Sequence, residues 1–548
     1  MTTRYLLAAE ADKIQDFIFR ASHLREVVGG SQLLTRFCEE VPERLLSQYG
    51  SDAKKNVVIN SGGSFRILFN HSGDANDFGE KLSEIYRLAA DGSLSVAEVV
   101  SVDEPLKENF GKANKLAEEK LRQVKRSRKG WQTTPHLPYV AFCSSCGIGL
   151  ATEYRKLYPT DDKSQYLCKS CLAKREEREA VHELGPFLET FYRAVTGTDD
   201  PERFDWPGKR ERGDSKEYDP VEDIADLDDR SYVAYLLADG NEMGIFFDMC
   251  RTVEQIQVLS QGLDNVICQS LAVPTKKAKE LIKRESFIPL LPLIMGGDDL
   301  FALIPASWAL DFANCFSREY EKQIGTLLKK PEFDEIRDEI PKPTVSVSVI
   351  ICKNKYPYTL AHNEGEIRLK EAKRMCKRLA QKEDKHLSSV NFKVILGGSL
   401  PQTKNSNTSK MRPTLRPYWV GDAALGWGLS LNHLIEQRYK LRNIPNKRLS
   451  ELSQLYDYPI MPSSLAKDEH GPWKSKQDYL LARIGRDEEQ KRSIDGALKH
   501  LGSDGDGHWY HVQRSVDRNW YGHGLPDLLE AWDFALSLDC PKENYEVE

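Results

Sequence analysis

Two adjacent aspartates, Asp298 and Asp299, separate two apolar runs in the stretch LPLIMGGDDLFALIP, which covers residues 291–305. A short turn between two apolar runs predicts a β-hairpin with these carboxylates at its tip. Neighbouring like charges repel, and a buried charge is costly unless it is paired or binds a metal. The two aspartates therefore indicate a metal site, while a polar β-turn is the alternative for the letters GGDD taken alone.

A third carboxylate, Asp239, ends the apolar run YVAYLLAD. A sheet that sets the end of this strand beside the hairpin would bring Asp239, Asp298 and Asp299 together. Carboxylate oxygens suit Mg²⁺ or Mn²⁺, and Mg²⁺ keeps several waters and is shared with substrate phosphates. Two such ions can activate an attacking hydroxyl and neutralise the leaving pyrophosphate, so we expect the three aspartates to be catalytic metal ligands.

Small residues flank these carboxylates. Gly296 and Gly297 keep the turn free of side chains, so that a triphosphate can approach. Gly240 and Asn241 follow Asp239 and could offer backbone N–H groups to phosphates. We therefore expect these four residues to belong to the nucleotide site.

A cation is still needed for the triphosphate. Lys373, in the stretch LKEAKRMCK, lies on a predicted helix and is the expected residue, with Lys370 and Lys377 as rivals. Phosphoryl transfer depends mostly on positioning and charge neutralisation, so no general-base histidine is required.

Four cysteines form two Cys-x-x-Cys pairs, Cys143 with Cys146 and Cys168 with Cys171, and 21 residues separate the pairs. Each pair can present two thiolates to one tetrahedral ion, which predicts a Cys₄ zinc site. Because the protein fills all four positions, the zinc would be structural. A redox role is the alternative, but two such pairs in one segment argue against it.

The elements around these residues repeat. Residues 4–102 and 231–352 both show the order strand, helix, β-hairpin, helix, strand, which is typical of a ferredoxin-like palm. The letters also align, because YLLAA precedes SGGSF in the first half as YLLAD precedes MGGDD in the second. In this alignment Ala9, Ser64 and Phe65 occupy the places of the three aspartates, so the first palm is catalytically degenerate.

The predicted fold class is α+β, with two ferredoxin-like palm domains, a zinc-bearing helical insert and a helical C-terminal domain. The predicted parts are a first palm over 1–104, a helical domain with the cysteine module over 105–195, a linker over 196–230, the GGDD palm over 231–414 and the helical C-terminal domain over 415–548.

Composition narrows the class of protein. The 548 residues are 40% hydrophobic and 29% charged, as in a globular protein. No run of about 18 apolar residues exists, which predicts no membrane span, and early acidic residues argue against a secretory signal. We expect a cytoplasmic protein, and its net charge of -6 argues against a dedicated duplex-DNA binder.

The order of motifs resembles the large subunit of type III CRISPR effector complexes, the CRISPR polymerase, and especially its Cmr-type branch. The likeness covers roughly residues 4–440. The residues that carry it are AEADKIQDFIFRASHLREVVGGSQLL, SGGSF, CSSC with CKSC, LADGNEMG, IMGGDDLFALIP, TVSVSVIICKNKYPY and LKEAKRMCK.

This resemblance implies two palms packed face to face. It implies that the second palm converts ATP to 3′–5′ cyclic oligoadenylates, which are second messengers of antiviral defence. The three aspartates would hold the metals, and Asn241, Lys373 and the hairpin glycines would line the nucleotide site. Guide RNA, target RNA and other subunits of the complex would be partners, with target RNA as activator.

The chain departs from the family pattern in one respect. Many members begin with an HD-type nuclease domain, but none of the twelve histidines here is followed by Asp. We therefore expect signalling to be the sole chemistry of this subunit.

Three other hypotheses stay open. The same palm chemistry could join ATP to a non-nucleotide acceptor such as S-adenosylmethionine. A diguanylate-cyclase-like enzyme would share the Gly-Gly-acid-acid hairpin, although those enzymes usually carry one palm and Glu-Phe after the acid, where this chain has Asp299-Leu300. A scaffold that holds RNA and subunits would need no catalytic acids.

Overall fold

The computed structural model describes most of the chain. The described residues are 3–21, 23–50, 53–127, 140–156, 163–180, 186–198, 200, 203–209, 220–282, 284–396, 414–423, 425, 428–453, 479, 482–483, 488–502, 510–515 and 518–540. Within these parts of the chain, every helix is too short or too polar to cross a lipid bilayer.

The first sheet is the predicted degenerate palm. Its central order is β2-β3-β1-β4, and β5 also pairs with β1, so the last predicted strand is divided in two. Its strands are β1 (Thr3–Ala11), β2 (Val57–Ser61), β3 (Ser64–Phe69), β4 (Leu94–Val96) and β5 (Val100–Asp103). Its helices are α1 (Ile14–Phe19), α2 (Leu24–Leu46), α3 (Ala53–Asn56) and α4 (Ser72–Ala90).

The second sheet is the predicted GGDD palm, in the order β13-β12-β11-β8-β10-β9. Its strands are β8 (Tyr232–Gly240), β9 (Leu291–Gly296), β10 (Asp299–Pro305), β11 (Val345–Lys353), β12 (Ser389–Val394) and β13 (Tyr418–Trp419). Its helices are α9 (Met243–Met249), α10 (Val253–Leu281), α11 (Ala309–Leu327) and α12 (Tyr358–Glu383). Because β13 joins this sheet, the sheet extends beyond residue 414, where the sequence analysis placed a boundary.

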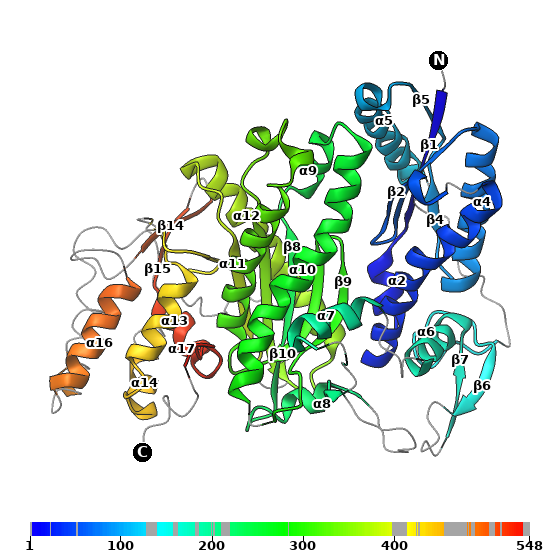
Figure 1. Cartoon of the computed structure of the whole chain (residues 1–548). Coiled ribbons are helices and arrows are strands. Elements are labelled where there is room, and N and C mark those ends of the chain that lie inside the picture. The colour runs from blue at the N-terminus through cyan, green and yellow to red at the C-terminus, as the bar shows by residue number, and fades with distance from the viewer. Residues whose placement is uncertain are drawn as a thin grey trace.

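Successive side chains of β8 pack into two different hydrophobic clusters, one on each face of the sheet. Ala234 and Leu236 pack in one hydrophobic cluster with residues of α10 and α11. Val233 and Leu237 pack in a second cluster with residues of α12 and of the first palm, including α2. Successive strand side chains point to opposite faces, so Asp239, two residues after Leu237, faces α12 and the first palm. Figure 1 shows the blue first palm beside the green second palm.

The two palms repeat in their strand register. Ala9 lies opposite Phe65 in the first palm, as Asp239 lies opposite Asp299 in the second. The two hairpins turn at positions that differ by one in the alignment of the palms. The first turns at Gly62 and Gly63, whereas the second turns at Gly297 and Asp298, although Gly296 is the residue that aligns with Gly62. The internal repeat that the sequence indicates is therefore a repeat of strand pairing.

The cysteine module lies between the palms in sequence and below the first palm in Figure 1. Its elements and their neighbours are α5 (Leu106–Ser127), β6 (Glu153–Lys156), β7 (Ser164–Leu167), α6 (Lys169–Ala180), α7 (Pro186–Thr196) and α8 (Pro220–Ala225). The β6–β7 hairpin, paired from Glu153 to Leu167, was not expected in a helical insert.

The described C-terminal elements are mostly helical. They are α13 (Leu431–Lys440), α14 (Asn446–Ser453), α16 (Glu488–Leu501), α17 (Gly524–Glu530), β14 (Tyr510–Ser515) and β15 (Arg518–Gly522). The β14–β15 hairpin is an addition to the predicted helical architecture.

A buried carboxylate joins this region to the second sheet. Asp527 on α17 is fully buried and accepts hydrogen bonds from the Leu415 N–H at 2.9 Å and the Tyr418 hydroxyl at 2.6 Å. Its carboxylate also pairs with Arg416 at 2.9 Å. Since every partner lies in the segment that forms β13, this one side chain fixes that strand against α17.

We predict that Asp527→Ala destabilises this region by about 2–3 kcal/mol, because the buried Leu415 N–H and Tyr418 hydroxyl would lose their acceptor. Arg416 would keep Glu530 as its ionic partner. Denaturant unfolding followed by tryptophan fluorescence measures the loss, since Trp419 lies in the same segment. The control is Asp533→Ala, which removes a half-exposed partner of Arg230 and should cost at most about 1 kcal/mol. Equal unfolding midpoints for the two variants would contradict the prediction.

Candidate active site and metal centre

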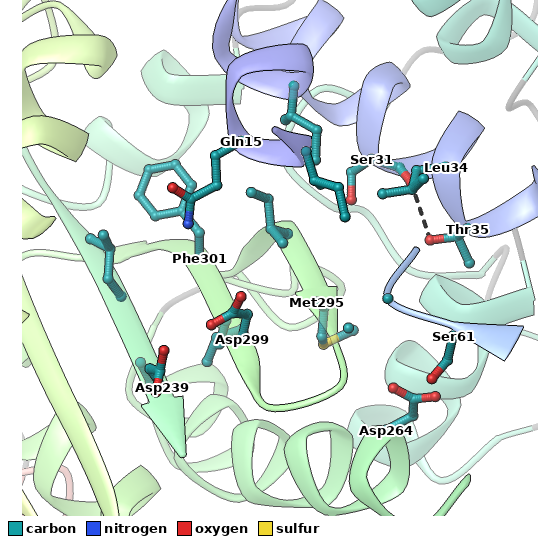
Figure 2. A pocket seen from close by; sticks show the side chains of 18 of the residues that line it. Gln15, Ser31, Leu34, Thr35, Ser61, Asp239, Asp264, Met295, Asp299 and Phe301 are labelled. Carbon is teal, nitrogen blue, oxygen red and sulfur yellow. Dashed lines mark hydrogen bonds between the residues drawn. The ribbon is translucent and has the colours of Figure 1, made fainter. Parts of the chain in front are cut away.

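Asp239 and Asp299 are direct cross-strand partners at the ends of β8 and β10. Strand alternation gives both side chains the same face, and Figure 2 shows both carboxylates at the lower end of the cavity that they line. Like charges placed directly opposite each other on a sheet are destabilising. The strand register therefore brings together two of the three predicted carboxylates without neutralising them.

Asp298 is placed differently, in the turn itself. Its carbonyl oxygen accepts the Gly240 N–H at 3.3 Å. A Cβ atom on Gly240 would lie 2.6 Å from the Tyr320 hydroxyl and 3.1 Å from the Asp298 Cβ, so only glycine fits there. Asp298 thus packs beside the end of β8 and is not among the residues that line the cavity.

The two hairpin carboxyls are hard to ionise. Burial, followed by the charges of Asp298 and Asp239, raises the pKa of Asp299 to about 8. Burial, followed by the charge of Asp239, raises the pKa of Asp298 to about 6. A divalent cation would reverse this trend, because it favours the ionised form of every ligand near it.

Lys373 reaches the site from α12. Its ammonium lies 2.6 Å from the Asp239 carboxylate, and the side chain is 41% exposed at the cavity. Lys370 also lines the cavity but lies 3.6 Å from Glu366, whereas Lys377 does not line it. Among the three lysines considered from sequence, Lys373 alone forms an ion pair with one of the three aspartates in the described structure.

Asn241 and Gly240 hold the end of β8. The Asn241 N–H donates to the Thr344 carbonyl at 2.9 Å, and its side chain bonds to Thr344 at 2.9 Å and to Ser346 at 2.7 Å. Both backbone N–H groups that we expected to face phosphates therefore donate to protein acceptors. These two hydrogen bonds hold the end of β8 in place, so they are structural contacts.

The two hairpin glycines have different surroundings. Gly297 has a φ of +62°, which favours glycine at this place in a tight turn. Its N–H donates to the Asp264 carboxylate at 2.9 Å. Gly296 lines the cavity and faces Gly62, whose Cα would lie 3.8 Å from an added Cβ. The turns of the two palms therefore meet here.

A cavity of about 390 Å³ opens between the palms beside these residues. Figure 2 shows its walls: β8, β9 and β10 below, and α1 with α2 of the first palm above. The second palm contributes Asp239, Asp299, Phe301 and Lys373, among others. The first palm contributes residues that the sequence analysis did not single out, including Gln15, Ser31, Thr35 and Glu39.

Two acids in this cavity lack a nearby cation among the described residues. Burial raises the pKa of Glu39, and the charge of Asp264 raises it further. Burial also raises the pKa of Asp264, although the hydrogen bond from Gly297 opposes this effect. The sequence offered one signal for Asp264, a lone acid in the largely apolar helical stretch VLSQGLDNVICQSLAV.

The donor chemistry suits a hard divalent cation at Asp239 and Asp299. Their oxygens face one cavity, and their proximity leaves negative charge only partly balanced by Lys373. Among the described residues, however, only the four cysteines have ligand atoms that all lie within 4.8 Å of one another. The three aspartates do not form such a group in this structure.

The cysteines fit zinc closely. The Sγ atoms of Cys146 and Cys168 are 3.8 Å apart. A tetrahedron with Zn–S bonds of about 2.3 Å has S–S edges of about 3.8 Å, far longer than a disulfide bond. All four thiols are free and mostly buried, so the cluster fits a closed, structural ion.

We predict that the purified chain carries one zinc ion, which Cys168→Ser would remove or weaken. Elemental analysis by mass spectrometry, after dialysis, measures the metal content. Cys315→Ser, a half-buried thiol outside the cluster, is the matched control and should leave zinc unchanged. Zinc that persists in the Cys168 variant would exclude the assigned ligand set.

We also predict that Asp299→Asn stabilises the metal-free protein at pH 8. Between its ordinary pKa of 3.8 and about 8, Asp299 stays protonated when folded but ionises when unfolded, so stability falls as pH rises. The gain should be on the order of a few kcal/mol, at about 1.4 kcal/mol per pKa unit.

Thermal unfolding in the presence of a chelator, from pH 4 to 8, tests this dependence. The difference between the wild type and the variant should vanish near pH 4. Asp422→Asn removes a carboxylate that is 84% exposed and should show no such trend. A gap that is independent of pH would disprove the assigned cause.

Comparison with known proteins agrees with this geometry. Residues 232–381 match the family model described as Cas10/Cmr2, second palm domain. The comparison with curated protein sequences gives no significant match.

Solved structures share the overall fold. Csm1 in T.onnurineus has a TM-score of 0.56 and 15% identity, over 98% of this chain and 70% of that one. A Csm1-Csm4 cassette in complex with cA4 has a TM-score of 0.50 and 16% identity, over 91% and 69%. A cassette in complex with pppApA has a TM-score of 0.50 and 15% identity, over 98% and 70%. Residues 232–381 therefore carry the second palm domain of the Cas10/Cmr2 family, within a chain whose fold resembles that of Csm1.

Proposed function

We propose that this chain is a nucleotidyltransferase that converts ATP to cyclic oligoadenylates when an RNA-guided complex binds its target RNA. The observation that carries the proposal is the pair Asp239 and Asp299 at one end of a cavity between two palms, with Lys373 beside them. The solved cassettes in complex with cA4 and pppApA support adenylate chains as products of this fold.

In this proposal Asp239 and Asp299 hold the divalent cations, and Asp298 either completes the set after a local shift or positions the turn. The cations would activate the attacking hydroxyl and neutralise the leaving pyrophosphate. Lys373 would exchange its carboxylate partner for a phosphate oxygen when ATP enters. Gly296 leaves the hairpin open on the cavity side, which gives the triphosphate room.

The expected partners follow from the same family. We propose that guide RNA, target RNA and other subunits assemble with this chain, and the Csm1-Csm4 cassettes support a subunit contact of this kind. Such a complex would act in the cytoplasm. The zinc module would have no chemical role in the transfer itself.

A second candidate product has an observation in its favour. The first-palm side of the cavity carries Glu39 near Asp264, and the described lysines of the cavity, Lys370 and Lys373, both come from α12. A second triphosphate in this acidic half would be repelled, whereas a cationic acceptor such as S-adenosylmethionine would be attracted. We therefore keep adenylyl transfer to a non-nucleotide acceptor as the alternative product.

Mass spectrometry of reaction products tests both. The protein, alone and in its native complex, is incubated with ATP, Mg²⁺ or Mn²⁺ and target RNA, with and without S-adenosylmethionine. Cyclic oligoadenylates that need target RNA support the main proposal. An adenylylated acceptor supports the alternative, and no nucleotide product under any condition leaves the scaffold hypothesis.

We predict that Asp298→Ala with Asp299→Ala reduces product formation by at least about 100-fold while the complex still assembles. Undiminished synthesis in the double variant would show that the assigned site is wrong.

Lys373→Ala should raise the KM for ATP by about 10-fold or more, because one charge-assisted hydrogen bond to phosphate is lost. Lys377→Ala, one turn further along α12 and outside the cavity, is the matched control.

A further inference from the structure

We propose that the four-cysteine module positions one wall of the interdomain cavity, and that Glu26 is the residue through which it acts. Glu26 touches no part of the cavity, so it would be a positioning residue. The proposal rests on the proposed function only where it uses ATP as the ligand of that cavity.

Glu26 lies in the first turn of α2 and is 1% exposed. Its carboxylate accepts a hydrogen bond from the Ser145 hydroxyl and pairs with the Arg175 guanidinium. Ser145 stands between the cysteines of the first pair, and Arg175 lies one turn after Cys171 on α6. One buried carboxylate on the palm therefore contacts both halves of the cysteine module.

A second buried cation also connects the cysteine module to the first palm. Lys174, next to Arg175, is fully buried and donates to the Phe17 carbonyl of α1. Its ammonium lies 4.2 Å from the centroid of the Phe17 ring. A Cβ atom on Gly30 would lie 3.3 Å from the Lys174 Cε, so a glycine on α2 makes room for this chain. Helix α6 is thus locked against both α1 and α2.

These two helices supply the first-palm wall of the cavity. Residues of α1 and α2 that line it include Gln15, Ile18, Ser31, Thr35, Cys38 and Glu39. Ser31 follows Glu26 by five residues on α2, which is about 7.5 Å along a helix. A shift at the start of α2 would therefore reach the cavity within two turns.

In this proposal, bound zinc keeps the two partners of Glu26 in position. A zinc ion would hold the two cysteine pairs together, and so keep Ser145 and Arg175 on the same carboxylate. Without it, four thiols within 4.8 Å of one another lose their common partner, and the two halves can separate. A buried carboxylate that loses its partners is strongly unfavourable, so α2 would move or open to hydrate it.

Hydrogen exchange on the full-length protein tests this coupling. We expect zinc removal by a chelator and Glu26→Gln each to speed amide exchange in residues 30–40 of α2 by at least 10-fold. Glu176→Gln is the matched control, since it makes the same change at an exposed carboxylate of α6 that pairs with Arg155 within the module, and it should change exchange less than 2-fold. Faster exchange in the cysteine segment alone, with α2 unchanged, would overturn the proposal.

ATP binding, measured by calorimetry, provides the second readout. Zinc removal and Glu26→Gln should each weaken binding by about 10-fold, and the two together should weaken it no further, because both act through one joint. Additive losses would overturn a shared route. If the zinc-loaded wild type binds no ATP, the proposed function fails while the exchange measurement still decides the coupling. If Glu26→Gln does not fold, Ser145→Ala with zinc titration of the wild type replaces it.

Discussion

Two carboxylates directly opposite each other on neighbouring strands impose the main electrostatic constraint on this protein. The pairing of Asp239 with Asp299 is fixed by the register of β8 and β10, and that register also places Leu237 and Phe301 in the core. A slip by one residue would turn every core side chain of the strand to the other face. The apolar core therefore forces an arrangement of charges that would be unfavourable by itself.

The two palms share one strand pairing but differ in the residues at its end. The first palm keeps the strand pairing but has Ala9 and Phe65 in place of the two facing acids. Without charges to neutralise, its sheet can pack closely, and its helices α1 and α2 can form the opposite wall of the cavity. The meeting of Gly62 with Gly296 shows how near the two hairpins come.

Much of this arrangement could be predicted from the sequence because its signals are local. The ends of apolar runs, the glycine turns and the Cys-x-x-Cys pairs mark strand ends, hairpins and a metal cluster without any knowledge of tertiary contacts. Glu39 gave no comparable signal, since acids on amphipathic helices are usually solvated, and Asp264 gave only that of a lone acid in a largely apolar helical stretch. Their place in the cavity depends on how two separate modules dock, and no short-range pattern encodes that docking.

Other differences have local causes. The sequence placed Asp298 near the other acids, and it lies in the turn beside Gly240, the residue that follows Asp239. Strand β13 is only two residues long, so no alternation of apolar and polar residues could mark it. The β6–β7 hairpin lies within the cysteine segment, where metal-ligand spacing dominated the sequence pattern.

The ion pair between Lys373 and Asp239 has a consequence for the resting protein. The lysine acts as a built-in counter-ion that occupies the carboxylate before any metal or nucleotide arrives. In the proposed function, entry of a metal-bound nucleotide would then be an exchange of partners, in which the carboxylate would pass to the cation and the lysine to a phosphate. Such an exchange would keep Lys373 and Asp239 paired throughout, so Asp299 is the acid whose protonation would have to change when a cation arrives.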